Sequence, residues 1–253
     1  MGIDGAFIAW CWDAGRSPVT IRHWSRIVGR FCAEHDPLTA TSDDIRAYLG
    51  RWNRSPANTR HTYRVALAAL YRWLVDEVEL LEIDPMRKVP KVPSPKGAPR
   101  PITDAQFATV LADASPTMRA WLLLGADAGL RRAEIARTDP TAPMGRRLHV
   151  IGKGTRQRIV PLSLRLSDAL ANVDPWQVTP RQVGQRMSWH MRRRGVDATA
   201  HQLRHYAATR YYAASGNDLR ATQAFLGHAS SATTEIYVAW SSDGLDIVDR
   251  MVA

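Results

Sequence analysis

The sequence predicts a mainly α-helical protein with a small all-α domain over residues 1–87 and an α+β domain over residues 102–253, joined by a basic, proline-rich linker over residues 88–101. Three observations support this prediction. Apolar residues recur every three or four positions on both sides of the linker, which is typical of amphipathic helices. The prolines of the linker exclude helix interiors and sheet ladders. Two short β-branched runs flank a Gly-Lys-Gly-Thr turn, which predicts one small antiparallel sheet in an otherwise helical domain.

The region before the linker is predicted to form four helices. Three of them begin at a residue that can cap the first turn, namely Thr20, Ser42 and Ser55, and Pro56 would occupy a first helical position. The predicted helices span 4–14, 20–35, 42–52 and 55–81.

The linker contains basic residues and no acidic ones. Its basic residues are Lys88, Lys91, Lys96 and Arg100. Its composition favours extended, polyproline-like structure. Such a segment can be a solvated spacer or a strap that lies along a phosphate backbone, and the two interpretations are compatible.

The region after the linker is predicted to alternate helices with a single hairpin. Thr103 is a candidate cap for its first helix, and Gly129 can end its second. The predicted helices span 104–114, 116–128, a start near 131, 163–173, 179–194, 199–214, 217–226 and 230–240, with the hairpin over 148–161.

The charge balance indicates a polyanionic partner. The formal net charge is +10 and the pI is about 10.2. Most of the excess lies in residues 100–253, which carry 20 Lys or Arg against 13 Asp or Glu. No apolar stretch approaches the ~18 residues that span a bilayer, so nucleic acid is favoured over a membrane. No secretory signal follows Met1, which predicts a cytoplasmic protein.

Lys153 is the only lysine after residue 96, in a chain whose positive charge is otherwise almost all arginine. A lysine can give up its proton whereas a guanidinium stays protonated, so a lone lysine at a hairpin tip is a candidate general acid. The alternative is that Gly-Lys-Gly is simply a good turn.

A histidine, an arginine and a second histidine follow at i, i+3 and i+4: His201, Arg204 and His205. On a helix they share one face and can converge on one ligand. A zinc pair formed by the two histidines is the rival interpretation, but the arginine on the same face would repel a cation. Solvent-facing or core histidines are the simplest alternative.

Tyr237 lies nine residues after His228 of a Leu-Gly-His sequence. By itself a helical tyrosine is most often part of a core. Three other tyrosines in the same half of the chain, Tyr206, Tyr211 and Tyr212, lack this relation to a histidine and are predicted to be core residues.

Together with Gly129-Leu130-Arg131-Arg132-Ala133-Glu134, these features resemble the tyrosine recombinase, or phage integrase, family in motif order and spacing over residues 125–240. The resemblance implies six catalytic residues: Arg131, Lys153, His201, Arg204, His228 and Tyr237. It implies supporting roles for Glu134 and His205. Residues 1–87 would be the core-binding, SAM-like helical domain and 102–253 the catalytic domain. The sequence departs from the family at residues 137–145, a short proline-rich segment where the family has the first strand of its sheet, so that strand is expected to be missing or degraded.

The resemblance implies a phosphoryl transfer in which Tyr237 forms a 3′-phosphotyrosine, with the arginines in the place of metal ions, so that no metal or cofactor is needed. The implied partner is double-stranded DNA carrying attachment or core sites, bound by a homotetramer on two duplexes, with an accessory DNA-bending protein as a possible addition. The location would be the bacterial cytoplasm, at the nucleoid. The predicted DNA-binding residues are Lys88, Lys91, Lys96, Arg100, Arg156, Arg158, Arg60 and Arg64.

Several roles remain open at this point. Integration and excision of a phage or other mobile element is favoured over an Xer-type enzyme that resolves chromosome dimers. A DNA-binding relative without catalysis is a third interpretation, and a type IB topoisomerase a fourth. The tail after Tyr237 has Ile247, Val248, Met251 and Val252 on one face, and it could dock on a neighbouring protomer or pack on its own domain.

Overall fold

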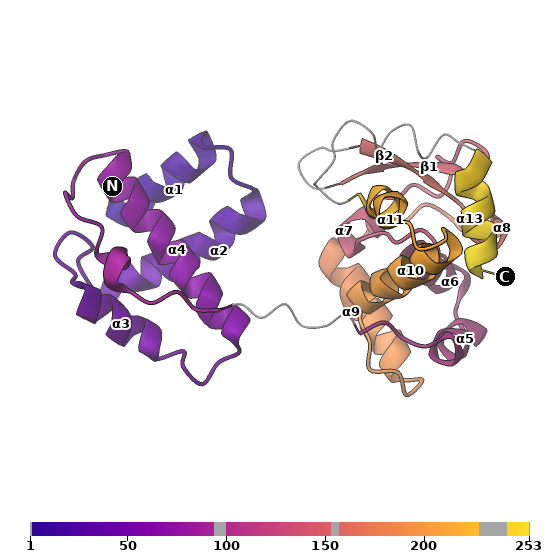
Figure 1. The fold of residues 1–253 in the computed structure, drawn as a ribbon, viewed down its shortest axis with the longest axis horizontal. Coiled ribbons are helices and arrows are strands. Elements are labelled where there is room, and N and C mark those ends of the chain that lie inside the picture. Colours follow the sequence, from indigo (N-terminus) through magenta and orange to yellow (C-terminus); the bar gives the residue numbers. More distant parts are fainter. Residues whose placement is uncertain (1, 94–99, 153–156, 228–241, 253) are drawn as a thin grey trace. The chain divides into compact units, whose positions relative to one another are not determined.

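The computed structural model of the chain describes residues 2–93, 100–152, 157–227 and 242–252. It divides into two compact units, Met1–Gly97 and Ala98–Ala253, and the division falls inside the predicted linker. Figure 1 shows a wholly helical first unit and a second unit of helices with a two-stranded sheet. The predicted fold class, mainly α with one small antiparallel sheet, is confirmed.

The described residues of the first unit, 2–93, form four α-helices and a short 3-10 helix. They are α1 (Ile3–Asp13), α2 (Pro18–Glu34), α3 (Ser42–Gly50), α4 (Ala57–Asp76) and η1 (Pro85–Lys88). The predicted caps are wrong by one to three positions. Ser17 caps α2 by accepting from the Thr20 N–H, and Thr41 caps α3 in a capping box with Asp44. Pro56 occupies the cap position of α4, directly before its first helical residue.

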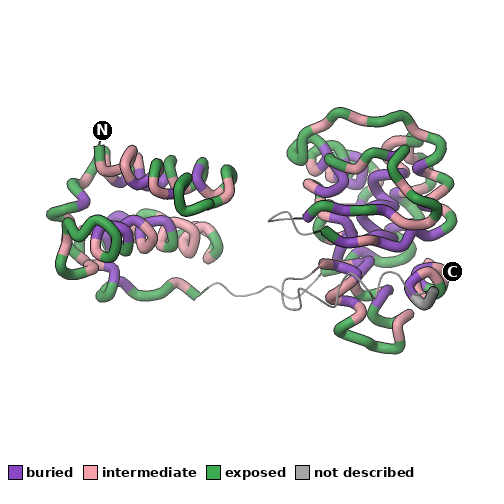
Figure 2. The backbone as a smooth tube through the Cα atoms, turned by 90° about the horizontal axis from the view of Figure 1, so that it is seen from above, coloured by how far each residue is buried: buried purple, intermediate pink, exposed green. Residues whose placement is uncertain are grey.

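Aromatic side chains fill the core of the first unit. Phe31 packs edge-on against Tyr48 at a ring-centroid distance of 5.1 Å, and Phe7 packs against Trp73 at 5.7 Å. Buried residues lie on the inner faces of the helices, as the purple segments of Figure 2 show. The core continues past α4 to Val89, which is 5% exposed. The first residues of the predicted linker therefore belong to this unit.

The second unit is built around α6, whose residues 120–126 are all buried. Helices α8, α9 and α10 pack against α6. Its described elements are α5 (Asp104–Ala112), α6 (Pro116–Ala126), α7 (Arg132–Ile135), β1 (Arg147–Ile151), β2 (Gln157–Pro161), α8 (Leu164–Ala171), α9 (Pro180–Arg192), α10 (Ala200–Ala214), α11 (Leu219–Leu226) and α13 (Ser242–Val252). The predicted helix at 230–240 lies outside the described residues.

Strands β1 and β2 form an antiparallel hairpin in which Leu148 pairs with Val160. Leu148, Val150 and Val160 are buried, so one face of the sheet covers the core. The segment 137–145 is described throughout and contains no strand, in agreement with the predicted loss.

Helix α13 packs on its own unit against α10. Val248 and Met251 are buried, and Arg146 of the segment before β1 donates two hydrogen bonds, of 2.9 and 2.5 Å, to the Asp249 carboxylate. Arg210 of α10 also donates to the Met251 carbonyl. The tail therefore packs on its own domain within the described chain, and docking on a neighbouring protomer stays a prediction. Among the described helices none is both long and apolar enough to cross a membrane.

Candidate active site

Two glycine turns meet at the centre of the second unit. Gly129 follows α6 with φ +62° and Gly227 ends α11 with φ +64°, a backbone region that other residues rarely adopt. A Cβ on Gly129 would lie 2.9 Å from Leu226 Cδ2, so the absence of a side chain lets the two turns touch.

Arg204 of α10 joins these turns. Its guanidinium is buried, with the residue 5% exposed, and donates to the carbonyls of Gly129 and Leu226, the latter at 2.7 Å. A guanidinium carries five N–H donors, and these two bonds use two of them. Arg204 is also one of the residues that line the adjacent cleft.

Glu134 of α7 holds two further arginines. Its carboxylate accepts from the Arg131 backbone N–H and from Arg131 Nη1, both at 2.9 Å. It also accepts from Arg158 Nη1 at 3.1 Å and Arg158 Nη2 at 2.9 Å. The Glu134 side chain is 1% exposed, so this carboxylate is a buried anchor that orients Arg131.

Arg131 and Arg158 both bind the Glu134 carboxylate, and Arg204 lies near enough to interact with all three charges, which leaves an excess of two positive charges in this cluster. Burial, followed by repulsion from Arg131 and Arg158, lowers the pKa of Arg204. A guanidinium nevertheless keeps its proton in proteins, so the excess charge favours binding of an anion.

The same network predicts an acid-sensitive contribution to stability. Burial by itself would raise the pKa of Glu134, but the hydrogen bonds and charge of Arg158, together with those of Arg131, outweigh it and lower the pKa to about 2. Because the folded pKa is below the unfolded value, this stabilisation is complete above pH ~5 and is lost as the pH falls toward 2. We expect the stability difference between wild type and Glu134→Gln to shrink by about 1 kcal/mol between pH 6 and pH 4. Urea unfolding of both proteins at the two pH values measures it, and an unchanged difference would contradict the ion-pair geometry.

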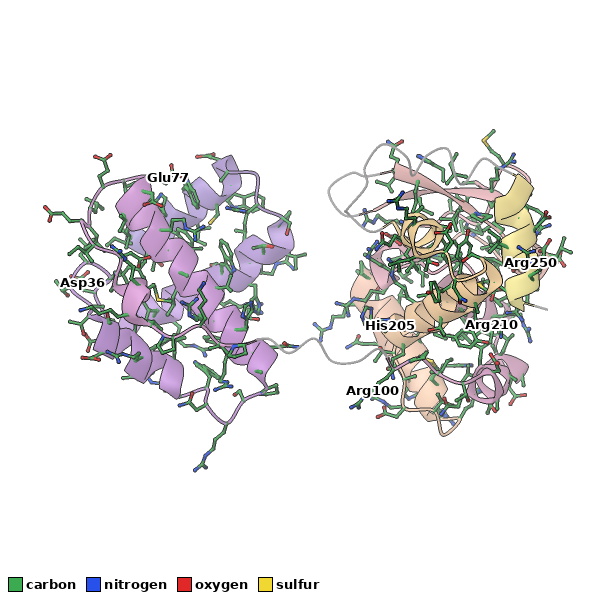
Figure 3. All side chains as sticks on the ribbon, in the orientation of Figure 1. Asp36, Glu77, Arg100, His205, Arg210 and Arg250 are labelled. Atoms are coloured by element: carbon green, nitrogen blue, oxygen red, sulfur yellow. The ribbon has the colours of Figure 1, made fainter. Side chains whose placement is uncertain are left out.

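His201 and His205 lie one turn apart on α10 with ring centroids 4.3 Å apart. His201 is exposed and lines the same cleft as Arg131 and Arg204. His205 (labelled in Figure 3) is half-buried, and burial, with the neighbouring His201 and Arg204, lowers its pKa. A neutral His205 can support His201 without adding to the positive charge. No cluster of three or more His, Cys, Asp or Glu suited to a metal occurs within the described residues.

The cleft has a volume of about 1130 Å³ and lies along α9 and the start of α10. Its α9 wall contains basic and aromatic residues that the sequence analysis did not single out. They are Arg181, Arg186, Trp189 and Arg192. Trp189 is 61% exposed, and the Arg193 guanidinium lies 4.6 Å from its ring. The spacing of Arg181, Gln185 and Arg192 along one helix face was visible in the sequence and could have predicted this surface.

The predicted DNA-binding residues differ in how far they are exposed to solvent. Lys88, Lys91 and Arg100 are exposed, and Arg60 is half-buried. Arg64 instead donates to the carbonyls of Pro90 and Val89, at 2.8 and 3.0 Å, and so fastens the start of the linker to α4.

Arg158 requires a correction. Arg158 was predicted to bind DNA, but the residue is 6% exposed and both of its Nη atoms donate to Glu134. Five predicted site residues lie outside the described residues: Lys96, Lys153, Arg156, His228 and Tyr237. The structure therefore brings together Arg131, His201 and Arg204 of the six predicted catalytic residues.

Comparisons with known proteins show which proteins this chain is similar to. The phage integrase family model matches residues 170–243. Tyrosine recombinase XerA of Thermococcus kodakarensis is 31% identical over 251 residues, which cover 88% of this chain and 85% of XerA. The integrase from mycobacterium phage Brujita has a TM-score of 0.57 at 27% identity, over 98% of this chain and 91% of that chain. A lambda integrase fragment, solved as a dimer bound to a core site, has a TM-score of 0.76 at 16% identity, over 90% of this chain and 94% of that chain, which shows a shared fold.

The second unit has Arg131 and Arg204 at one cleft, in a fold similar to that of a phage integrase, and these features indicate the class of site-specific recombinases. Because the match to XerA extends over most of both chains at 31% identity, this chain belongs to the tyrosine recombinase family.

Proposed function

We propose that this chain cuts and rejoins double-stranded DNA through a covalent bond between Tyr237 and a phosphate. The observation that carries the proposal is the convergence of Arg131, His201 and Arg204 on one cleft next to a surplus of positive charge. A planar guanidinium can bind two phosphate oxygens with parallel hydrogen bonds, so two arginines can hold the non-bridging oxygens of a phosphodiester. Their fixed donors stabilise the charge that builds on those oxygens during displacement.

In the proposed step, the Tyr237 oxygen attacks phosphorus and the bond from phosphorus to the 5′ oxygen breaks. His201 accepts the phenol proton or binds the phosphate, Lys153 protonates the leaving 5′ oxygen, and His228 donates a hydrogen bond to the phosphate. The product is a 3′-phosphotyrosine and a free 5′-hydroxyl. The 5′-hydroxyl of a second DNA then attacks the phosphotyrosine, which restores the tyrosine and rejoins the strand. The bond energy is conserved, so no nucleotide cofactor is consumed.

The domain roles follow from the same proposal. The first unit would bind the DNA as a core-binding domain, the linker after Pro90 would run along the phosphate backbone, and the second unit would perform the chemistry. Four copies on two duplexes would allow strand exchange. The similarity in fold to lambda integrase, solved as a dimer on a core site, supports the DNA partner.

The α9 wall supports a path for the DNA backbone, and this predicts a salt-dependent effect. Replacing Arg181 with glutamine is expected to weaken DNA binding about three- to tenfold and to reduce the slope of log affinity against log salt by about 0.9. Fluorescence anisotropy over a salt series measures both quantities. Arg250→Gln is the matched control, because Arg250 (labelled in Figure 3) is exposed on α13 and does not line the cleft. Equal slopes for wild type and Arg181→Gln would remove Arg181 from the DNA path.

A covalent adduct tests the main proposal. The binding site is first selected from a random duplex library by affinity for the full chain. A set of duplexes is then made, each with one nick next to a different candidate cleavage position. Cleavage beside a nick releases a short 5′-hydroxyl fragment that diffuses away, so the strand cannot be rejoined and the covalent intermediate accumulates. We expect a protein–DNA band that survives denaturation. If wild type forms none on any selected duplex, the chain binds DNA without catalysis.

For the biological role we propose integration and excision of a mobile element, which the similarity to a phage integrase over 98% of this chain supports. The similarity to XerA favours a second candidate, resolution of replicon dimers. Two plasmids in one assay separate them. An integrase is expected to join an attachment site to a different partner site, whereas a resolving enzyme recombines two copies of one site. Relaxation of supercoils without exchange would indicate a topoisomerase.

A further inference from the structure

We propose that Arg158 is a positioning residue that saturates Glu134 and thereby keeps the Arg131 guanidinium free for phosphate. The inference rests on the proposed function, since it concerns the arginine that would bind the scissile phosphate. Arg158 does not line the cleft, so its role would be exerted through Glu134.

The first argument is the number of acceptor sites on Glu134. An ionised carboxylate offers about four lone-pair positions on its two oxygens. Four donors occupy them: the Arg131 backbone N–H, Arg131 Nη1, Arg158 Nη1 and Arg158 Nη2. Glu134 therefore takes only one guanidinium N–H from Arg131. The second contact of that guanidinium, from Nη2 to the Gly227 carbonyl, is long at 3.4 Å.

The second argument is what would follow if Arg158 were absent. Two acceptor positions on a carboxylate that is 1% exposed would lose their partners, and solvent could not replace them freely. Arg131 is the other cation already bound to that carboxylate. A bidentate pair is the preferred geometry for arginine and carboxylate, so Glu134 would draw both Nη atoms of Arg131 away from the cleft. The net positive charge of the cluster formed by Arg131, Arg158, Arg204 and Glu134 would also fall by one.

The third argument is that Arg158 contacts the turn at the end of α11. A Cβ on Gly227 would lie 2.9 Å from Arg158 Cδ and 3.2 Å from Nε. The arginine stem therefore lies directly beneath this turn, whose carbonyl groups accept from Arg131 and Arg204. The Arg158 side chain thus contacts both Glu134, which binds Arg131, and the turn whose carbonyls accept from Arg131 and Arg204.

A double-mutant cycle tests the inference with Arg158→Met, Glu134→Gln and the double variant. We expect Arg158→Met to slow single-turnover adduct formation about 10- to 100-fold at saturating DNA, since a displaced catalytic group costs that much. DNA affinity is expected to change less than threefold, because Arg158 is buried away from the cleft surface. If Arg158 acts through Glu134, the double variant is no slower than the slower single variant. Arg158→Lys, which retains one cation beside Glu134, should recover part of the rate.

The matched control is Arg165→Met. Arg165 makes a similar bidentate pair with the buried Asp127 of the same unit but does not line the cleft. Arg165→Met should lower the thermal stability of the protein. The rate of adduct formation per folded molecule should stay at the wild-type value. Multiplicative effects in the cycle, or a wild-type rate in folded Arg158→Met, would overturn the inference.

A second measurement does not depend on catalysis. Inorganic phosphate titrated into the full chain, followed by calorimetry, should bind about tenfold more weakly to Arg158→Met than to wild type and Arg165→Met, with Arg158→Lys between the two. If wild type forms no adduct but this order of affinities holds, the proposed function fails and the positioning role stands. If adducts form and the phosphate affinities are equal, the positioning role fails alone.

Discussion

Replacing Tyr237 with phenylalanine is expected to abolish the covalent adduct and all strand exchange while leaving DNA binding within about twofold of wild type. The change removes only the phenol oxygen, which is the proposed nucleophile. The aromatic ring is retained, so its packing is expected to be unchanged. Loss of a nucleophile in a covalent mechanism reduces the rate by on the order of 10⁶-fold, which takes the adduct below detection. The measurement is the denaturing gel of the nicked-duplex assay, with anisotropy for binding.

The matched controls are the tyrosines of α10. Burial raises the pKa values of Tyr206 and Tyr211 to about 12, so both are poor sources of phenolate near neutral pH. Tyr212 is 39% exposed, which makes the prediction that it is a core residue wrong. Tyr212→Phe should therefore form adducts at the wild-type rate. An adduct that persists in Tyr237→Phe and disappears in Tyr212→Phe would reassign the nucleophile.

Replacing Arg204 with lysine is expected to slow adduct formation about 10²- to 10³-fold, which is the usual cost of removing one donor to a charged transition state. Lysine keeps the charge, but its single ammonium cannot bind the carbonyls of Gly129 and Leu226 and also present paired donors to a phosphate. Single-turnover rates at saturating DNA separate this effect from weaker binding.

Folding must be controlled in this experiment, because Arg204 is buried and links two turns. Arg210→Lys is a suitable control on the same helix. Arg210 donates to Asp104 and Tyr206 and does not line the cleft, so its replacement should affect stability more than rate. If Arg204→Lys and Arg210→Lys slow adduct formation equally per folded molecule, Arg204 has a structural role only.

Helix positions were predictable because apolar periodicity and capping residues act within a few positions of one another. Thr103 and Thr179 begin their helices with capping boxes as their local sequences predict. The errors have the same local origin. Ser17 precedes Thr20 and can satisfy the first N–H groups earlier, because Pro18 fits the first helical turn and supplies no donor of its own.

The sequence by itself determined the class of protein, since the order and spacing of the arginine, histidine and tyrosine motifs do not depend on how the helices pack. Only the tertiary structure decided which arginines face the cleft. Glu134 and Arg158 are 24 positions apart, and Arg204 and Gly129 are 75 apart, so no local pattern reports that they touch. The same is true of Arg64 and the linker carbonyls. Their charge predicts exposure for all the arginines of the sequence. Burial of Arg158 and Arg204 becomes favourable only because a carboxylate or carbonyl from a distant segment accepts their hydrogen bonds.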